Sequence, residues 1–163
     1  MSKAWPVLNL DRKGTLAENA RQVLAVRVAE LASQSAAADD PEAIEPLHDL
    51  RISAKRLRYT LELLRDVFGD SGRSWRSEVK ELQERLGVLH DSDVRIALIE
   101  DELVAMATEP GARAAEERSG LISLLAEERV GRTAAYARFR KFWDRLNELR
   151  MIPELEGMAA TAA

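Results

Sequence analysis

The sequence predicts an all-α fold, an antiparallel four-helix bundle with long helices, and three observations support this prediction. Apolar residues recur at spacings of three and four through four long stretches, which is the pattern of one buried helix face. Glycine and proline stand mainly between these stretches, where they would divide helices. We find neither the alternation typical of a strand nor a hairpin signal. Four helices joined by short or moderate loops favour an up-down arrangement.

The first two helices have recognisable ends. A helix over about 16–33 follows Thr15, which is a suitable N-cap, and Glu18 stands at capping-box spacing. The polar loop AAADDPEA comes next. The second helix begins near Pro46, a residue suited to a first turn, and ends at Gly69.

The last two helices are longer. After a turn at Ser71-Gly72, the third is expected from near Ser74 to about Met106, with a deformation at Gly87. Pro110-Gly111 breaks the chain, and the fourth helix covers about 112–149. Gly120 and Gly131 are its weak points.

Length and composition indicate one domain, 1–163, with a core over about 15–149 and flexible ends at 1–14 and 154–163. The net charge of −4 argues against a general nucleic-acid binder. The absence of cysteine excludes disulfides and thiolate zinc sites. The first residues do not resemble a signal peptide, and no stretch reaches the roughly 18 apolar residues of a membrane span, so we expect a cytoplasmic protein.

The stretch LHDLRISAKRLRY, residues 47–59, is crowded with cations. On a helix it has two apolar sides, which predicts that neighbours hold it from both. The main core stripe is Leu47, Leu50, Ala54, Leu57, Leu61, Leu64 and Phe68. The second and shorter stripe is Ile52, Tyr59 and Leu63.

Between these stripes lies a single basic row, His48, Arg51, Lys55 and Arg58. Like charges at helical spacing repel, so the row suggests an anionic partner, although a simply solvated charged face remains an alternative. Arg56 lies off the row and is a weaker candidate.

Two further helices carry basic rows, and the sequence leaves open whether the three rows converge. Arginine and lysine suit phosphate oxygens, and histidine adds a donor with a switchable charge. No glycine-rich loop or base-stacking aromatic residue indicates a nucleotide pocket, so a linear or clustered phosphate is favoured. The row of the third helix is Arg73, Arg76, Lys80, Gln83, Gly87 and His90, and that of the last helix is Arg138, Lys141 and Arg145.

LHDLRISAKRLRYTLELL, followed by LQERLGVLHDSDVRIALIEDEL, resembles the CHAD domain, the conserved histidine α-helical domain. The resemblance is close over about residues 44 to 105, and the flanking helices fit the family in length and order. The residues that match the family pattern are His48, Arg51, Lys55, Arg56, Arg58, Leu86, Gly87, Asp91, Asp93 and Val94.

The resemblance implies binding of inorganic polyphosphate on a basic helical surface, without catalysis and without a cofactor or metal. It also implies association with polyphosphate granules or polyphosphate-metabolising enzymes. His90 stands where the family usually has arginine. Members commonly contain two four-helix halves whereas this chain has one, so we expect a homodimer.

Asp91 and Asp93 are interpreted as structural partners that orient arginines, or as caps of a helix restarting after Gly87. Two enzyme-related alternatives remain. His48 could accept a phosphoryl group in a histidine phosphotransfer domain, although Ile52 and the extra arginines fit poorly. The His48-Asp49 and His90-Asp91 dipeptides also occur in HD-type phosphohydrolases, although the basic rows would repel a divalent metal.

Overall fold

The computed structural model describes residues 3–108 and 112–160, and within them every regular element is helical, which confirms the all-α fold. None of the helices in the described ranges combines the length and apolar character needed to cross a membrane. The elements are α1 (Leu16–Ser33), η1 (Ser35–Asp39, 3₁₀), α2 (Ile44–Leu63), α3 (Arg65–Ala105), η2 (Met106–Thr108, 3₁₀), α4 (Ala112–Glu148) and α5 (Met151–Ala160).

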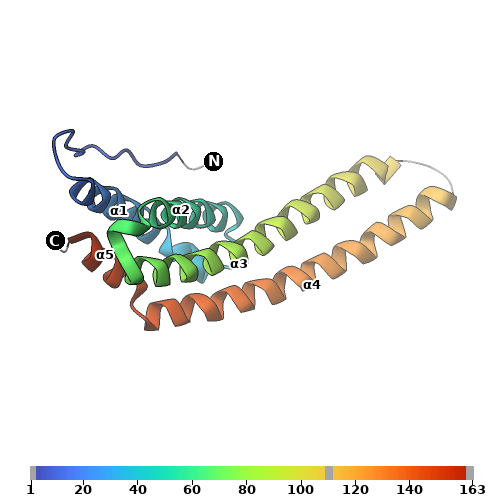
Figure 1. Cartoon of the computed structure of the whole chain (residues 1–163). Helices are drawn as coiled ribbons and strands as arrows, with labels where there is room; N and C mark the ends of the chain where they lie inside the picture. Colours follow the sequence, from blue (N-terminus) through green and yellow to red (C-terminus); the bar gives the residue numbers. More distant parts are fainter. Residues whose placement is uncertain (1–2, 109–111, 161–163) are drawn as a thin grey trace.

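The chain forms a helical body from which the ends of two helices project (Figure 1). α2 packs along α3, α3 pairs with α4, and α1 packs against α2 and α5. α3 and α4 continue together beyond the start of α2, as a two-helix arm that we define as residues 94–105 and 113–133. The predicted four-helix bundle is not confirmed, because α4 and α5 share the fourth place in the body and only two helices make up the described part of the arm.

The start of α1 confirms the predicted capping box. The Glu18 backbone N–H donates to Oγ1 of Thr15 at 3.2 Å, and the Thr15 backbone N–H donates to Oε2 of Glu18 at 2.7 Å. Hydrogen bonds from the Thr15 backbone and hydroxyl hold the pKa of Glu18 below its usual value.

The boundary between α2 and α3 differs from the prediction. α2 ends before Leu64, and Gly69, with φ of 56° and ψ of −141°, interrupts the helical backbone of α3. The turn predicted at Ser71-Gly72 is wrong, because both residues are helical. Gly72 is buried, and a Cβ added there would collide with the side chain of Phe68. Gly69 therefore makes the turn, and Gly72 allows the returning helix to pack closely.

The other glycines of the long helices do not interrupt them. α3 keeps helical backbone angles through Gly87, where a deformation was expected, and α4 runs unbroken through Gly120 and Gly131. The break expected at Pro110-Gly111 lies outside the described residues.

The chain end also differs from the prediction, since residues expected to be frayed form α5. Arg150 turns the chain with φ of 56°, and Pro153 lies in the first turn of α5, where its missing N–H costs no helical hydrogen bond. Met151 and Leu155 are buried against the body, and this burial offsets the weak helix signal. Residues 3–14 form no helix but lie near α1, with the Trp5 N–H donating to Glu30.

The main core stripe is confirmed within α2, where Leu47, Leu50, Ala54, Leu57 and Leu61 are all buried, while Leu64 and Phe68 beyond its end are partly buried. Of the second stripe only Ile52 is partly buried, and the prediction that the rest is covered is wrong. Tyr59 is 50% exposed and Leu63 is 82% exposed. α1 meets α2 at Arg56, which binds Glu30, and leaves this side of the helix open to solvent.

Candidate functional site

The basic rows of α2 and α3 face each other across the surface where these antiparallel helices pack. The ring centroids of His48 and His90 are 5.2 Å apart. Nε of Arg51 lies 3.8 Å from the position that a Cβ would take on Gly87. Further along, Nη2 of Arg76 donates to Oε1 of Glu62 at 3.0 Å.

These contacts share one register. From His48 to Glu62 the numbering on α2 rises by 14, and from His90 to Arg76 the numbering on α3 falls by 14. The same register brings Lys55 opposite Gln83 and Arg58 opposite Lys80. Two of the three predicted rows therefore form one strip about 20 Å long. We call it the basic strip, and its members are His48, Arg51, Lys55, Arg58, Arg76, Lys80 and His90.

The two sides of the basic strip differ in charge balance. On α3, Arg76 pairs with Glu62 and Lys80 with Glu84, and Arg73 beyond the end of the strip pairs with Asp70. On α2, the three cations Arg51, Lys55 and Arg58 have no ion pair with any carboxylate among the described residues. The uncompensated positive charge is therefore concentrated on α2.

Buried polar atoms of the basic strip, and of Gln83 beside it, also lack partners. Nε of Arg51, Nε of Arg58 and Oε1 of Gln83 are buried without a hydrogen bond within the described residues. The guanidinium carbon of Arg58 lies 4.3 Å from the centroid of the Tyr59 ring, which orients that side chain along α2. A bound anion would supply acceptors for the two arginine N–H groups.

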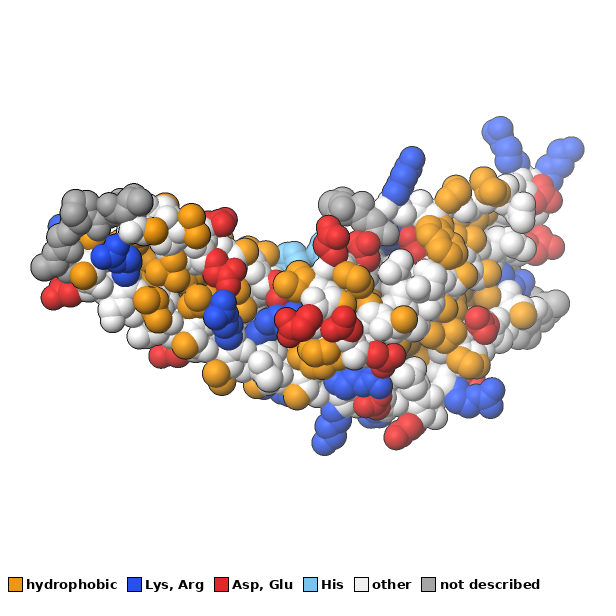
Figure 2. Space-filling model, turned by 180° about the vertical axis from the view of Figure 1, so that it is seen from behind, with side chains coloured by type: hydrophobic (Ala, Val, Ile, Leu, Met, Phe, Trp, Pro, Cys, Tyr) orange, Lys and Arg blue, Asp and Glu red, His pale blue; other side chains and the backbone are white. Residues whose placement is uncertain are grey.

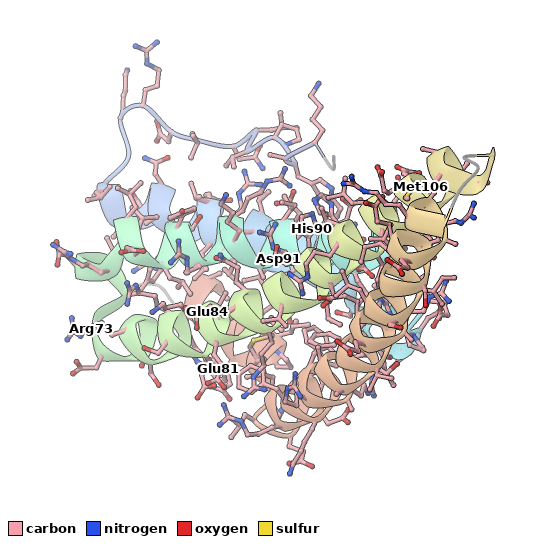
Figure 3. The ribbon with its side chains drawn as sticks, turned by 90° about the vertical axis from the view of Figure 1, so that its right-hand side faces the viewer. Arg73, Glu81, Glu84, His90, Asp91 and Met106 are labelled. Atoms are coloured by element: carbon pink, nitrogen blue, oxygen red, sulfur yellow. The ribbon has the colours of Figure 1, made fainter. Side chains whose placement is uncertain are left out.

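The two histidines close the end of the basic strip nearest the arm. Nδ1 of His48 lies 3.4 Å from Oδ1 of Asp49, and Nδ1 of His90 lies 3.4 Å from Oδ1 of Asp91. Figure 2 shows histidine surface at the step where the arm joins the body. Figure 3 shows His90 and Asp91 together on α3, far from Arg73 at the opposite end of that helix.

The two aspartates have separate surroundings. Asp91 is exposed, and its contact is with the neighbouring histidine rather than with an arginine. Asp93 forms an ion pair with Arg132 of α4, and both side chains are 10% exposed. Asp93 thus meets an arginine, as expected of an orienting carboxylate, but Arg132 belongs to none of the predicted rows. The signal for Arg132 was its place in the apolar stripe of α4 together with Ala135 and Phe139.

The row on α4 does not join the basic strip. Arg138, Lys141 and Arg145 line an open hollow of about 1120 Å³ along α4, on the side where α3 presents Glu81 and Arg85. Arg145 pairs with Glu78 of α3, and its guanidinium carbon lies 4.8 Å from the centroid of the Phe142 ring. Figure 3 shows Glu81 on the side of α3 that faces α4, so acidic residues separate this row from the strip.

Arg56 points away from the basic strip and pairs with the buried carboxylate of Glu30. It donates to Oε1 of Glu30 at 2.5 Å, and Arg27 donates to Oε2 of the same carboxylate at 2.6 Å. Glu30 is almost completely buried, so its charge requires these two cations. Within the described residues, no group of three or more histidine and carboxylate side chains is arranged to hold a metal ion.

Comparison with known proteins gives one match. No curated protein and no solved structure matches the chain. The family model of the CHAD domain matches residues 3–100. This segment contains α1, α2, most of α3 and the whole basic strip. Because this match covers more than half of the chain, the protein belongs to the CHAD domain family.

Proposed function

We propose that the protein binds inorganic polyphosphate, or a similar linear phosphate polyanion, along the basic strip. The observation that carries the proposal is the run of Arg51, Lys55 and Arg58, three cations on one face with no carboxylate partner among the described residues. Membership of the CHAD domain family supports it, because that family is linked to polyphosphate binding in general.

The geometry of the strip suits a linear ligand. Successive cations of the α2 row stand three or four residues apart, which is a rise of about 4.5–6 Å along the helix. A phosphate chain lying in this direction meets one cation in every helical turn. Arginine can hold two phosphate oxygens in its planar fork, while lysine and histidine supply single donors.

The predicted contact residues contribute unequally in this proposal. Arg51, Lys55 and Arg58 form the main contacts, because they need not release a carboxylate first. The two histidines add contacts at the end of the strip, where each lies 3.4 Å from a neighbouring aspartate. Arg73, Arg76 and Lys80 each exchange an existing ion pair for phosphate, which lowers their net gain. Arg138, Lys141 and Arg145 lie on a separate surface and are not required for binding to the strip.

The protein acts as a binding module rather than as an enzyme in this proposal. Its role is to bring itself, and any polyphosphate-metabolising enzyme bound to it, to polyphosphate granules. No catalytic residue is needed for that role, and His48 serves as a phosphate contact.

The test measures binding of long-chain and short-chain polyphosphate to the full chain at two salt concentrations. Affinity should rise with chain length and fall steeply with salt, because binding releases counterions. Lys55→Glu and Arg58→Glu should weaken binding and should each lower the salt slope by about one or more.

Lys141→Glu is the matched control, because Lys141 is an exposed lysine on the α4 surface. It makes the same change in net charge without touching the strip. Binding that ignores both salt and chain length would refute the proposal. Equal losses from Lys55→Glu and Lys141→Glu would show that only overall charge matters.

A further inference from the structure

Large apolar side chains are exposed along the arm. Figure 2 shows hydrophobic surface over much of this projection. Val104 is 75% exposed and Ile122 is 58% exposed, and Leu98, Leu124 and Val130 are exposed as well. Within the arm, α3 packs against α4, and the buried apolar residues include Ile99 of α3 and Leu125 of α4.

One face of the arm continues the surface that the body covers. Ala97 and Val104 follow Val79 and Leu86 by 18 residues, which is five helical turns, so they point in the direction that α2 covers in the body. Ile122 precedes Arg140 by the same number of residues, and Arg140 donates to the Ala38 carbonyl of η1 at 3.1 Å. We call this the inner face of the arm, with members Ala97, Glu100, Val104, Ile122, Ala126 and Arg129.

The inner face is ready to be buried, unlike the other sides of the arm. Its two charged residues already pair with each other, since Arg129 donates to Glu100 at 2.6 Å. Its other members are apolar. Other sides of the arm also have exposed apolar residues, such as Leu98 on α3 and Leu124 on the opposite face of α4, but Glu102, Glu117 and Glu127 stand within two helical turns of them. Burial of those sides would therefore cost more desolvation.

We propose that the inner face binds the inner face of a second copy of this chain, with the two arms antiparallel. The open layer beside the arm is two helices wide, and the arm of another copy supplies two helices. A parallel arrangement would bring the two bodies into collision, because each body projects on the inner side of its own arm. In the antiparallel arrangement, each arm tip instead meets the partner's body at the start of its α2.

The inner face offers a modest area for contact. Twelve residues of α3 and about twenty of α4 give flat contact on the order of 500 Å² per copy, from helix rise and diameter. Contact between the tip and the partner's body adds to this area. The total approaches the lower end of stable interfaces, so we expect a dimer of micromolar rather than nanomolar affinity.

The same symmetry aligns the two basic strips. On α3, the strip residues lie on the side that faces away from α4. Arg85 marks the side that faces α4, because its guanidinium donates to the Arg138 carbonyl of that helix. The twofold axis of antiparallel arms lies in the interface and runs from the strip side to the α4 side. Rotation about it keeps both strips on one side of the dimer, with their histidine ends towards the axis. One long polyanion can then bind both strips, a step that rests on the proposed function, whereas the dimer does not.

The dimer is tested by sedimentation or light scattering of the full chain across a wide concentration series. Wild type should change from monomer to dimer as concentration rises, and Val104→Glu should stay monomeric. Leu98→Glu is the control, because it puts the same charge on the same helix about 120° away from Val104, outside the inner face. Both side chains are exposed, so neither variant should unfold the monomer, which circular dichroism checks. A wild type that is monomeric throughout, or loss of the dimer only in Leu98→Glu, would overturn the proposal.

Measurements of polyphosphate binding by the same variants distinguish failure of the dimer from failure of the proposed function. Val104→Glu should keep the affinity for short chains but lose about tenfold or more for chains that reach both strips, because the second contact is no longer intramolecular. If Lys55→Glu leaves binding unchanged while Val104→Glu is monomeric, the proposed function fails and the dimer stands. If Val104→Glu is monomeric but binds long chains as tightly as wild type does, then a single polyanion does not bind both basic strips of a dimer.

Discussion

Lys55 and Arg56 are neighbours in the sequence but have opposite environments. Lys55 is exposed on the basic strip and has no ion pair with a described carboxylate, whereas Arg56 holds the buried Glu30 together with Arg27. The helical projection separates the two residues, because they differ by about 100° around α2. A residue next to the strip in sequence can thus have a structural role, by pairing with a buried carboxylate.

Glu62 limits the basic strip at one end, and its removal should strengthen binding. The hydrogen bond from Arg76 holds the pKa of Glu62 below its usual value, so the carboxylate stays ionised and paired at neutral pH. Glu62→Gln should free Arg76 and raise polyphosphate affinity about two- to fivefold, the range expected of a surface ion pair. Equilibrium binding at fixed salt measures this change.

Protonation of Glu62 in acid should free Arg76 in the wild type, as the Glu62→Gln substitution does at neutral pH. Since the pKa is lowered in the folded state, the pair persists as pH falls through the ordinary range of glutamate and is lost only below it. The affinity difference between wild type and Glu62→Gln should therefore hold near neutrality and shrink in strong acid. Glu117→Gln, which removes a carboxylate paired with Arg113 on the arm, is the control and should change nothing. A Glu62→Gln variant that binds no better than wild type would mean that Arg76 does not contact the ligand.

At the scale of elements, α5 shows how tertiary burial overrides weak local signals. Leu155 is completely buried against the body and belongs to the main core cluster. Leu155→Ala should lower the free energy of unfolding by about 2–5 kcal/mol, through lost transfer energy and a residual cavity. Urea denaturation measures the loss. Leu149→Ala, at a half-exposed position only six residues earlier, should cost well under half as much, and equal losses would show that α5 does not pack as described.

The element boundaries show which signals a sequence carries. The bounds of α1 were predicted correctly because Thr15 and Glu18 mark its start with a local hydrogen-bond pattern. The break after α2 was misplaced because Gly69 and Gly72 are both glycines, and only the structure distinguishes a left-handed turn from close packing. α5 was missed because Pro153 and Gly157 resemble helix breakers, while the burial that stabilises the helix is not visible in local sequence.

The candidate site was predicted row by row, but its assembly was not. Spacing within one helix determines which side chains share a face, so the α2 row could be read directly. Which rows meet depends on how the helices are shifted and rotated relative to one another. The residue spacing within one helix carries no information about that packing. That is why Arg138, Lys141 and Arg145 were grouped with residues from which Glu81 and Glu84 separate them.

At the scale of the whole molecule, a chain of net charge −4 presents a positive strip because three cations without a described carboxylate partner, Arg51, Lys55 and Arg58, share one face of α2. Arginines elsewhere bind carboxylates across helices, as in the pairs Arg95–Glu128, Arg129–Glu100 and Arg140–Asp39. Other cations without a described carboxylate partner, such as Arg138 and Lys141, lie on a separate surface. The protein can therefore attract a polyanion locally while its overall charge opposes unspecific association.

The division into body and arm predicts two levels of stability. In the body, α3 packs against both α2 and α4, whereas in the arm it packs against α4 alone. Opening the arm exposes less apolar surface, so its amides should exchange hydrogen faster than those of the body in dilute solution. Hydrogen exchange of residues 96–105 and 114–130, compared with 79–89, measures this difference.

Hydrogen exchange measured at several protein concentrations tests whether the arms of two copies pair. If arms pair through their inner faces, exchange in both arm segments should slow as concentration rises, while exchange in the body stays constant, because only the dimer protects the arm. Val104→Glu should abolish this dependence and Leu98→Glu should retain it. Arm amides that are as protected as those of the body in dilute solution would mean that α3 and α4 are stable as a pair. In that case the exposed inner face would give no energetic reason for a second copy to bind.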